Sequence, residues 1–148
     1  MKTIFDKTTR DELITRINTL DENSKAQWGK MNVYQMLKHC TLAEELYLGK
    51  STHKRVLLGR LIGKMALKNL LKDERPMGRN APTSDAFIVK EITGDVASEK
   101  RKWMALTEEY TNFSEPYFVH WFFGKMTKEQ LGYFVYKHTD HHLRQFNS

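Results

Sequence analysis

Residues 127–145 read TKEQLGYFVYKHTDHHLRQ, and this stretch carries a clear helical pattern. Thr127 and Gln130 form a capping box, in which each side chain accepts a hydrogen bond from the other's backbone N–H at the start of a helix. Apolar residues follow at helical spacing, and His138, His141 and His142 continue the same face. The pattern predicts a helix from about 127 to 146 that points its histidines into the core.

These histidines suit a metal ion. His138 and His142 are four residues apart, so their Cβ atoms lie about 5 to 6 Å apart on one face of a helix. That separation allows both rings to hold one ion through bonds of about 2.1 Å. Buried imidazoles without partners are costly, so the alternative is a set of hydrogen-bonded core residues. His141 is predicted to support a ligand from beside it, or to replace one as a ligand.

A further inward histidine, His39, lies on the apolar side of a helix predicted for residues 33–49. In a helical bundle, metal sites are built from side chains of facing helices. His39, His138 and His142 are therefore the predicted ligands. Three neutral imidazoles leave one coordination position open, as in catalytic zinc sites, and they also suit nickel or iron. The alternative for His39 alone is a hydrogen-bonded core residue.

The other periodic segments predict an all-α protein, a four-helix bundle with one additional basic helix. Breakers between residues 73 and 94 indicate a long ordered loop between the second and third bundle helices, with a short extended piece at 87–89. A second, aromatic-rich loop covers 113–126. With 148 residues, the chain is expected to form a single domain over 1–148. The remaining helices are predicted at 10–21, 33–49, 54–72 and 96–112.

Several residues are predicted to surround the three histidines. Gln35 lies one turn before His39 and is expected either to orient a ligand or a bound water, or to be a simple buried amide. His120 sits among aromatic residues and is expected to pack or to cap a turn. No catalytic base emerges, because Glu44 and Glu45 project at least about 100° away from His39 on their helix. The pocket at the bundle end is predicted to be lined by Trp28, Tyr34, Trp121 and Phe122.

The net charge of +6 is concentrated in the amphipathic segment 54–72, which contains six basic residues and no acidic one. One interpretation is a non-catalytic binding module that contacts an anionic membrane or nucleic acid. The other is a helix packed on the bundle by its apolar side, with its lysines in solvent. Packing explains the same pattern, so we expect neither a membrane nor a nucleic acid as partner. The basic residues are Lys54, Arg55, Arg60, Lys64, Lys68 and Lys72.

Cysteine content and the N-terminus bear on the compartment. Cys40 is the single cysteine, which excludes an internal disulfide bond and fits a reducing environment. The first residues lack the apolar run and the small-residue cleavage site of a secretory signal, so a cytoplasmic protein is expected. A small molecule is the expected substrate. Exposed apolar residues of 54–72 or of the aromatic loops could also form a homodimer.

Four motifs carry a resemblance over nearly the whole chain: Trp28-Gly29-Lys30-Met31, His39, Phe123-Gly124-Lys125-Met126-Thr127, and His138-Thr139-Asp140-His141-His142-Leu143-Arg144-Gln145. They resemble the DinB/YfiT-like superfamily of metal-binding four-helix bundles, and more closely an uncharacterised branch of it. The resemblance implies that His39, His138 and His142 hold the metal and that Gln145 supports them. Relatives include thiol-dependent transferases and isomerases. A low-molecular-weight thiol cosubstrate is therefore implied, with thiol transfer or metal-assisted hydrolysis as the reaction.

The end of the last motif departs from the superfamily pattern. The wider superfamily often reads H-H-R-G-Q where this chain has H-H-L-R-Q at residues 141–145, which places Arg144 where glycine is usual. A shared substrate contact at this position is therefore not carried over, whereas the metal ligands are unaffected.

Overall fold

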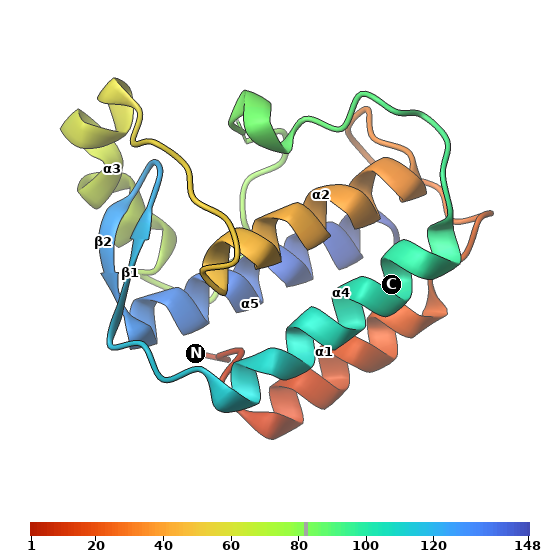
Figure 1. Cartoon of the computed structure of the whole chain (residues 1–148), viewed down its shortest axis with the longest axis horizontal. Helices are drawn as coiled ribbons and strands as arrows, with labels where there is room; N and C mark the ends of the chain where they lie inside the picture. Colours follow the sequence, from red (N-terminus) through yellow and green to blue (C-terminus); the bar gives the residue numbers. More distant parts are fainter. Residues whose placement is uncertain (82) are drawn as a thin grey trace.

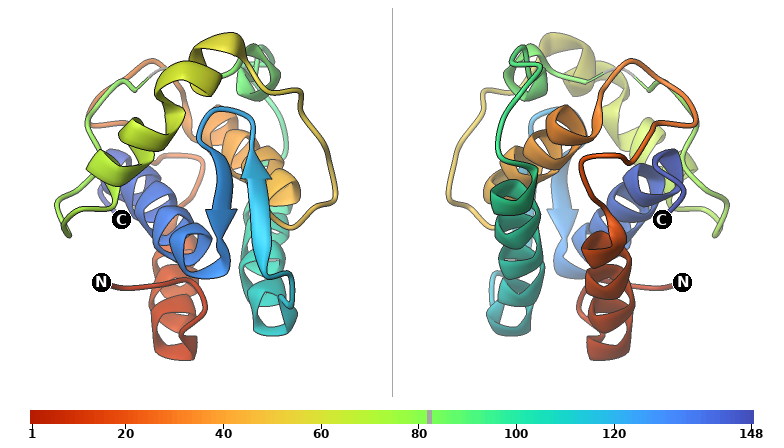
Figure 2. Two further views of the ribbon diagram at one scale, coloured as in Figure 1. Left: turned by 90° about the vertical axis from the view of Figure 1, so that its left-hand side faces the viewer. Right: turned by 90° about the vertical axis from the view of Figure 1, so that its right-hand side faces the viewer.

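The computed structural model describes residues 1–81 and 83–148. Within them, four long helices lie side by side, and a fifth stands apart at one end (Figure 1). A two-stranded hairpin covers that end, and the fifth helix lies across its tip (Figure 2). In chain order the elements are α1 (Lys7–Thr19), α2 (Val33–Tyr47), α3 (Leu57–Leu70), the 3-10 helix η1 (Asp85–Phe87), α4 (Val96–Glu109), the 3-10 helix η2 (Tyr110–Asn112), β1 (Tyr117–His120), β2 (Gly124–Thr127) and α5 (Lys128–Gln145).

The core lies between α1, α2, α4 and α5, each of which contributes a large side chain with no exposed surface. These side chains are Leu13, Met36, Trp103 and Leu131. The helices touch in a ring, because α2 contacts α4 and α5, and α1 contacts the same two helices. Such mutual burial supplies most of the stability of amphipathic helices, whose isolated propensity is weak.

Two of these helices begin at full capping boxes. Asn32 and Gln35 exchange side-chain and backbone hydrogen bonds at the start of α2, and Thr127 and Gln130 do the same at the start of α5. Each box satisfies two N–H groups that the first helical turn leaves without partners. The first helix differs from the predicted range of 10–21: α1 begins after Asp6, and Thr9 and Arg10 are buried within it.

The expectation of an all-α protein is wrong, because β1 and β2 form an antiparallel pair. Tyr117 faces Thr127 and His120 faces Gly124 in the register of this hairpin. The turn is closed from within by His120, whose Nδ1 accepts hydrogen bonds from the backbone N–H groups of Phe122 and Phe123. Gly124 has a φ of +78°, a conformation that glycine adopts without steric cost. The segment expected to be an aromatic loop is therefore a structured hairpin.

The basic helix α3 packs in an unexpected way. Its buried residues are Gly59, Gly63 and Leu67, and the two glycines lie directly against the backbone of Phe122 in the hairpin turn. A Cβ atom on either glycine would overlap the carbonyl oxygen of Phe122. Leu67, Leu70 and Leu71 pack against the core, but several apolar residues nearer the start of the helix are exposed, with Leu57 and Leu61 about three-quarters open to solvent at 74% and 76%.

The long connection between α3 and α4 contains η1, which places Phe87 in the core against α2. The extended piece expected at 87–89 does not form a strand; Phe87 ends a 3-10 turn that the Ser84 side chain caps. Val89 is also buried, and its carbonyl accepts a hydrogen bond from Gln35 on α2. Across residues 1–81 and 83–148, no helix combines the length and the apolar character needed to cross a membrane.

Candidate metal centre

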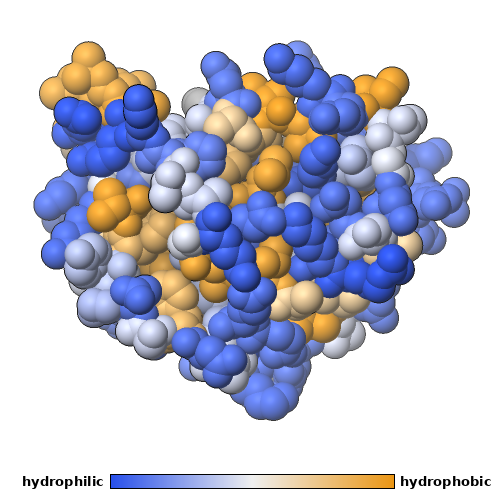
Figure 3. All heavy atoms as spheres, viewed as in Figure 1, coloured by the Kyte–Doolittle hydropathy of each residue, from blue (hydrophilic) through white to orange (hydrophobic). Residues whose placement is uncertain are grey.

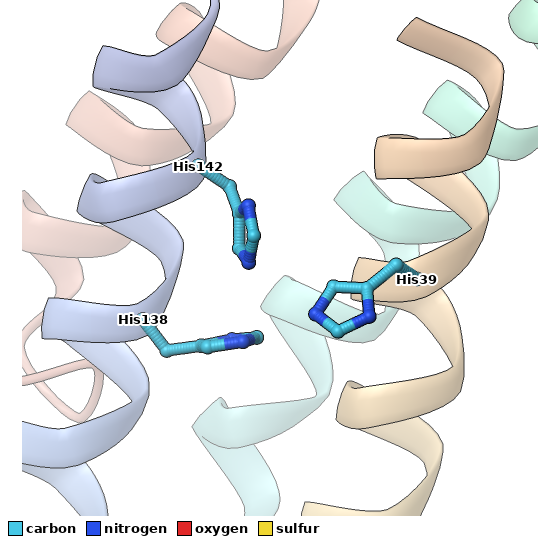
Figure 4. Close-up of side chains that lie close together, drawn as sticks. All are labelled: His39, His138 and His142. Carbon is cyan, nitrogen blue, oxygen red and sulfur yellow. The ribbon is translucent and has the colours of Figure 1, made fainter. Parts of the chain in front are cut away.

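Three histidines meet between α2 and α5. His39 comes from α2, while His138 and His142 come from successive turns of α5, and their rings point into the same space (Figure 4). Each ring offers one nitrogen, and the three nitrogens lie within 4.8 Å of one another. Tetrahedral ligands of one ion at about 2.1 Å are about 3.4 Å apart. A shift of about 1 Å by each nitrogen towards the centre would therefore suffice to hold one ion.

One ring nitrogen of His39, Nδ1, is hydrogen-bonded to a backbone carbonyl. Its Nδ1 lies 2.9 Å from the carbonyl oxygen of Phe87. A carbonyl oxygen only accepts hydrogen bonds, so Nδ1 carries the proton and donates it. The neutral ring then keeps its lone pair on Nε2. The 3-10 turn at Phe87 thus sets the tautomer of His39.

His142 is oriented through an amide. Its Nδ1 lies 3.0 Å from Oε1 of Gln145, and Nε2 of Gln145 donates to the carbonyl oxygen of Trp28 at 2.9 Å. The second hydrogen bond fixes which end of the amide faces His142. Nδ1 of His142 is therefore the donor, and its lone pair lies on Nε2. Histidines that bind metals usually donate their other N–H in this way.

Burial keeps these rings neutral. It lowers the pKa of His39, His138 and His142 below the ordinary value, and the neighbouring imidazoles lower the pKa of His138 and His142 further through charge repulsion. Neutral imidazole is the form that binds a metal. His39 and His142 are 6% exposed, whereas His138 keeps a larger part of its surface open. The donor set therefore fits a divalent transition metal.

His141 lies beside this cluster and outside it. Its ring is 5.1 Å from the ring of His142 and 5.8 Å from that of Trp28, centroid to centroid. His141 and Trp28 line a cavity of about 400 Å³. The guanidinium of Arg79 covers the Trp28 ring at 4.3 Å. Gln145 thus lies where a support for His142 was predicted, and His141 lies next to His142 without joining the three nitrogens.

The other predicted neighbours lie apart from one another. Gln35 completes the cap of α2 and bonds Val89, so its amide serves the loop rather than His39. Tyr34 packs on Gly94, and Trp121 packs on the outer side of Phe87, 6.3 Å between ring centroids. Phe122 supports α3. Of the four residues predicted to share one pocket, Trp28 alone lines the cavity beside His141.

The structure also shows participants that the sequence pattern did not reveal. Phe87 supplies the carbonyl for His39, although its segment looked like an extended surface piece. Tyr47 and Phe134 place their rings 5.9 Å from that of His138 and exclude water from its flank. His120 stays with the hairpin turn, and burial lowers its pKa to about 3. Periodicity marks Tyr47 and Phe134 as inward residues, but only the tertiary structure shows what they face.

Glu44 is a buried acid one turn beyond His39 on α2. The hydroxyl of Tyr110 donates to its carboxyl group at 2.5 Å, and Thr139 approaches it at 3.4 Å. Burial raises its pKa to about 7. Its carboxyl group is engaged with Tyr110 of η2 and Thr139 of α5, as the angle from His39 indicated.

Comparisons with known proteins add one finding. A family model described as a protein of unknown function, DUF1569, matches residues 3–148. Neither the curated proteins nor the solved structures contain a match.

Proposed function

The chain belongs to the DUF1569 family of proteins of unknown function, and from that starting point we propose that it is a metal-dependent enzyme acting on a small molecule. His39, His138 and His142 would hold the metal. The observation that carries the proposal is the pair of hydrogen bonds from His39 and His142, which turns both Nε2 lone pairs towards one point. A packing role alone would not require two histidines to share this orientation.

The resemblance of the motifs supports a relationship to the DinB/YfiT-like superfamily as part of the same proposal. The histidine spacing, Gln145 and the Trp28 segment are the residues that resemble it, and they now have contacts that give each a role. Gln145 joins His142 to the Trp28 backbone, and its own carbonyl accepts a hydrogen bond from the N–H of Gln27. The end of α5 is thereby tied to the loop before α2.

A zinc, nickel or iron ion bound to three neutral imidazoles would supply Lewis acidity and a free coordination position for a small molecule. The protein would position the ligands through Phe87 and Gln145 and exclude water with Tyr47 and Phe134. The acids nearest His39 are occupied elsewhere, since Glu44 bonds Tyr110 and Glu45 pairs with Lys102. We therefore assign no protein base.

The proposed reaction is thiol-dependent transfer or metal-assisted hydrolysis, with a low-molecular-weight thiol as cosubstrate. An imidazole-bound metal attracts thiolates, which supports the first of these reactions. Cys40, the single cysteine, is a buried thiol whose pKa is raised by burial, so the protein's own sulfur is not the nucleophile. A free buried thiol also fits the cytoplasm, which we propose as the compartment.

Metal content tests the proposal directly. Protein purified from unsupplemented cells should carry close to one transition metal per chain by elemental analysis. The double variant His138→Ala and His142→Ala should lose that metal, whereas His53→Ala, which removes a histidine outside the cluster, should retain it. Wild-type protein that binds no transition metal even after incubation with zinc, nickel and iron would refute the proposed metal centre.

The catalytic part needs a second measurement. Metal-loaded protein should show turnover with a low-molecular-weight thiol and an electrophile, and chelation should abolish it. A large fall in the melting temperature on chelation, with no thiol-dependent turnover or hydrolysis at any stage, would instead identify a structural metal.

A further inference from the structure

Helix α3 presents large apolar side chains to solvent along one side. Leu61 is 76% exposed and Met65 is 62% exposed, and Leu57, Leu58 and Ile62 continue the same surface. In Figure 3 this apolar group lies at the upper left, next to strongly hydrophilic residues. Contiguous apolar surface of this kind is uncommon on a protein without a partner for it. We refer to these five residues as the α3 apolar face.

The helix cannot bury this face by turning. Gly59 and Gly63 occupy the side that meets the hairpin, and there the backbone of Phe122 leaves no space for a Cβ atom. A rotation that moved Leu61 inward would bring a branched side chain against that backbone. The α3 apolar face is therefore held outward by the glycine contact on the opposite side.

The same helix is strongly basic. Arg60, Lys64 and Lys68 alternate with the apolar residues, and no acidic residue occurs anywhere from 54 to 72. Within residues 1–81 and 83–148, none of these three side chains takes part in an ion pair. A partner for this surface must therefore be both apolar and negatively charged.

Two candidate partners each provide only one of these two properties, apolar surface or negative charge. A second copy of the chain would cover the leucines, but a symmetric contact through α3 would bring two rows of like charge together without an acid to offset them. Nucleic acid would match the lysines, but its phosphates would leave Leu61 and Met65 in water. An anionic bilayer meets both, because its headgroups pair with lysines while apolar side chains enter the boundary with the acyl chains.

We propose that α3 docks in the plane of an anionic lipid bilayer. The helix is 14 residues long, about 21 Å, and lies on the surface rather than crossing it. The α3 apolar face enters the interface, and Arg60, Lys64, Lys68 and Lys72 reach the headgroups. This docking is independent of the metal centre, because none of the α3 residues contributes to it.

Vesicle binding tests the docking with the full chain. The protein should bind vesicles of phosphatidylcholine mixed with phosphatidylserine and should not bind vesicles of phosphatidylcholine alone. Lys64→Gln with Lys68→Gln should lower the partition about 25-fold, at about fivefold for each basic charge. Leu61→Gln with Met65→Gln should reduce binding to the background level. Lys25→Gln with Lys30→Gln removes the same charge far from α3 along the chain and should change the partition much less.

All substituted side chains are exposed, so the variants should keep the circular dichroism and melting temperature of the wild type. Absence of binding to phosphatidylserine vesicles would overturn the proposal. An equal loss in the two lysine double variants would overturn it as well, because it would show attraction by net charge alone. A dimer that Leu61→Gln with Met65→Gln dissociates, or oligonucleotide binding in place of vesicle binding, would assign α3 to another partner.

Discussion

Replacing Glu44 by glutamine should make the protein more stable than the wild type, and the difference should grow as the pH rises. The carboxyl group of Glu44 is 1% exposed, and it faces Tyr110 and Thr139. Burial raises its pKa from 4.5 to about 7, and the hydrogen bonds offset only part of this effect. Glutamine has nearly the same shape as the protonated acid and never ionises, so it reproduces the neutral form at every pH.

The sign follows from proton linkage. Between pH 4.5 and 7 the folded protein keeps the proton on Glu44, whereas the unfolded chain releases it. The stabilisation that the protonated Glu44 gives the folded state is thus complete below pH 4.5, and it is lost as the pH rises to about 7. The difference between the two pKa values corresponds to about 3 kcal/mol. Wild type and Glu44→Gln should therefore differ little at pH 5, and the variant should gain up to about 3 kcal/mol over the wild type by pH 8.

Urea unfolding from pH 5 to 8, with chelator present to remove metal, measures this difference. Other groups titrate equally in both proteins, so their contributions cancel in the comparison. Free-energy curves that run parallel across this range would refute the reasoning, because they would show that Glu44 ionises alike in the folded and unfolded states. A constant loss in the variant would indicate a packing defect only.

Three further outcomes follow from named contacts. Gln145→Ala should weaken zinc binding by about 10- to 100-fold in a competition titration, because Nδ1 of His142 loses its hydrogen-bond acceptor. An unchanged affinity for zinc would show that the amide of Gln145 has no role in orienting the ring. Gly63→Ala should destabilise the protein by about 1 to 3 kcal/mol in urea unfolding, because the new Cβ atom would overlap the backbone of Phe122. Gly78→Ala, with open space around it, should have little effect. Equal effects of the two substitutions would contradict the close contact between α3 and Phe122. His120 has its pKa lowered to about 3 by burial, so the stability it contributes is complete above pH 6.5 and is lost as the pH falls towards 3. His120→Asn, which keeps an acceptor for the hairpin turn, should flatten the fall in stability measured from pH 6.5 to 4.5, and an unchanged slope would contradict this assignment.

Sequence patterns predicted the parts of the structure that depend on local rules. The capping box at Thr127 marks a helix start through contacts within four residues, and α5 begins there; α2 begins at the predicted position 33. The apolar spacing that continues into His138 and His142 also placed both rings on the inner face of α5. His39 faces them because the inner faces of two adjacent helices must meet.

The parts that were missed depend on contacts between distant segments. His120 caps a turn, as one of its two expected roles, but the pairing of β1 with β2 on either side of that turn was not foreseen. Phe87 reaches His39 through a loop whose path no periodicity describes. The outward apolar side of α3 was missed for a related reason: Gly59 and Gly63 form much of the buried face together with Leu67, and a hydrophobicity pattern gives glycine little weight.

The strand β2 ends at Thr127 and α5 begins at Lys128, so no linker separates the hairpin from the histidine helix. Helix α3 packs on the tip of that hairpin. The surface that holds α3 is thus connected along the chain to the helix of His138 and His142 through β2 alone. A partner that fixed the position of α3 would therefore set the direction in which the three imidazoles face their surroundings.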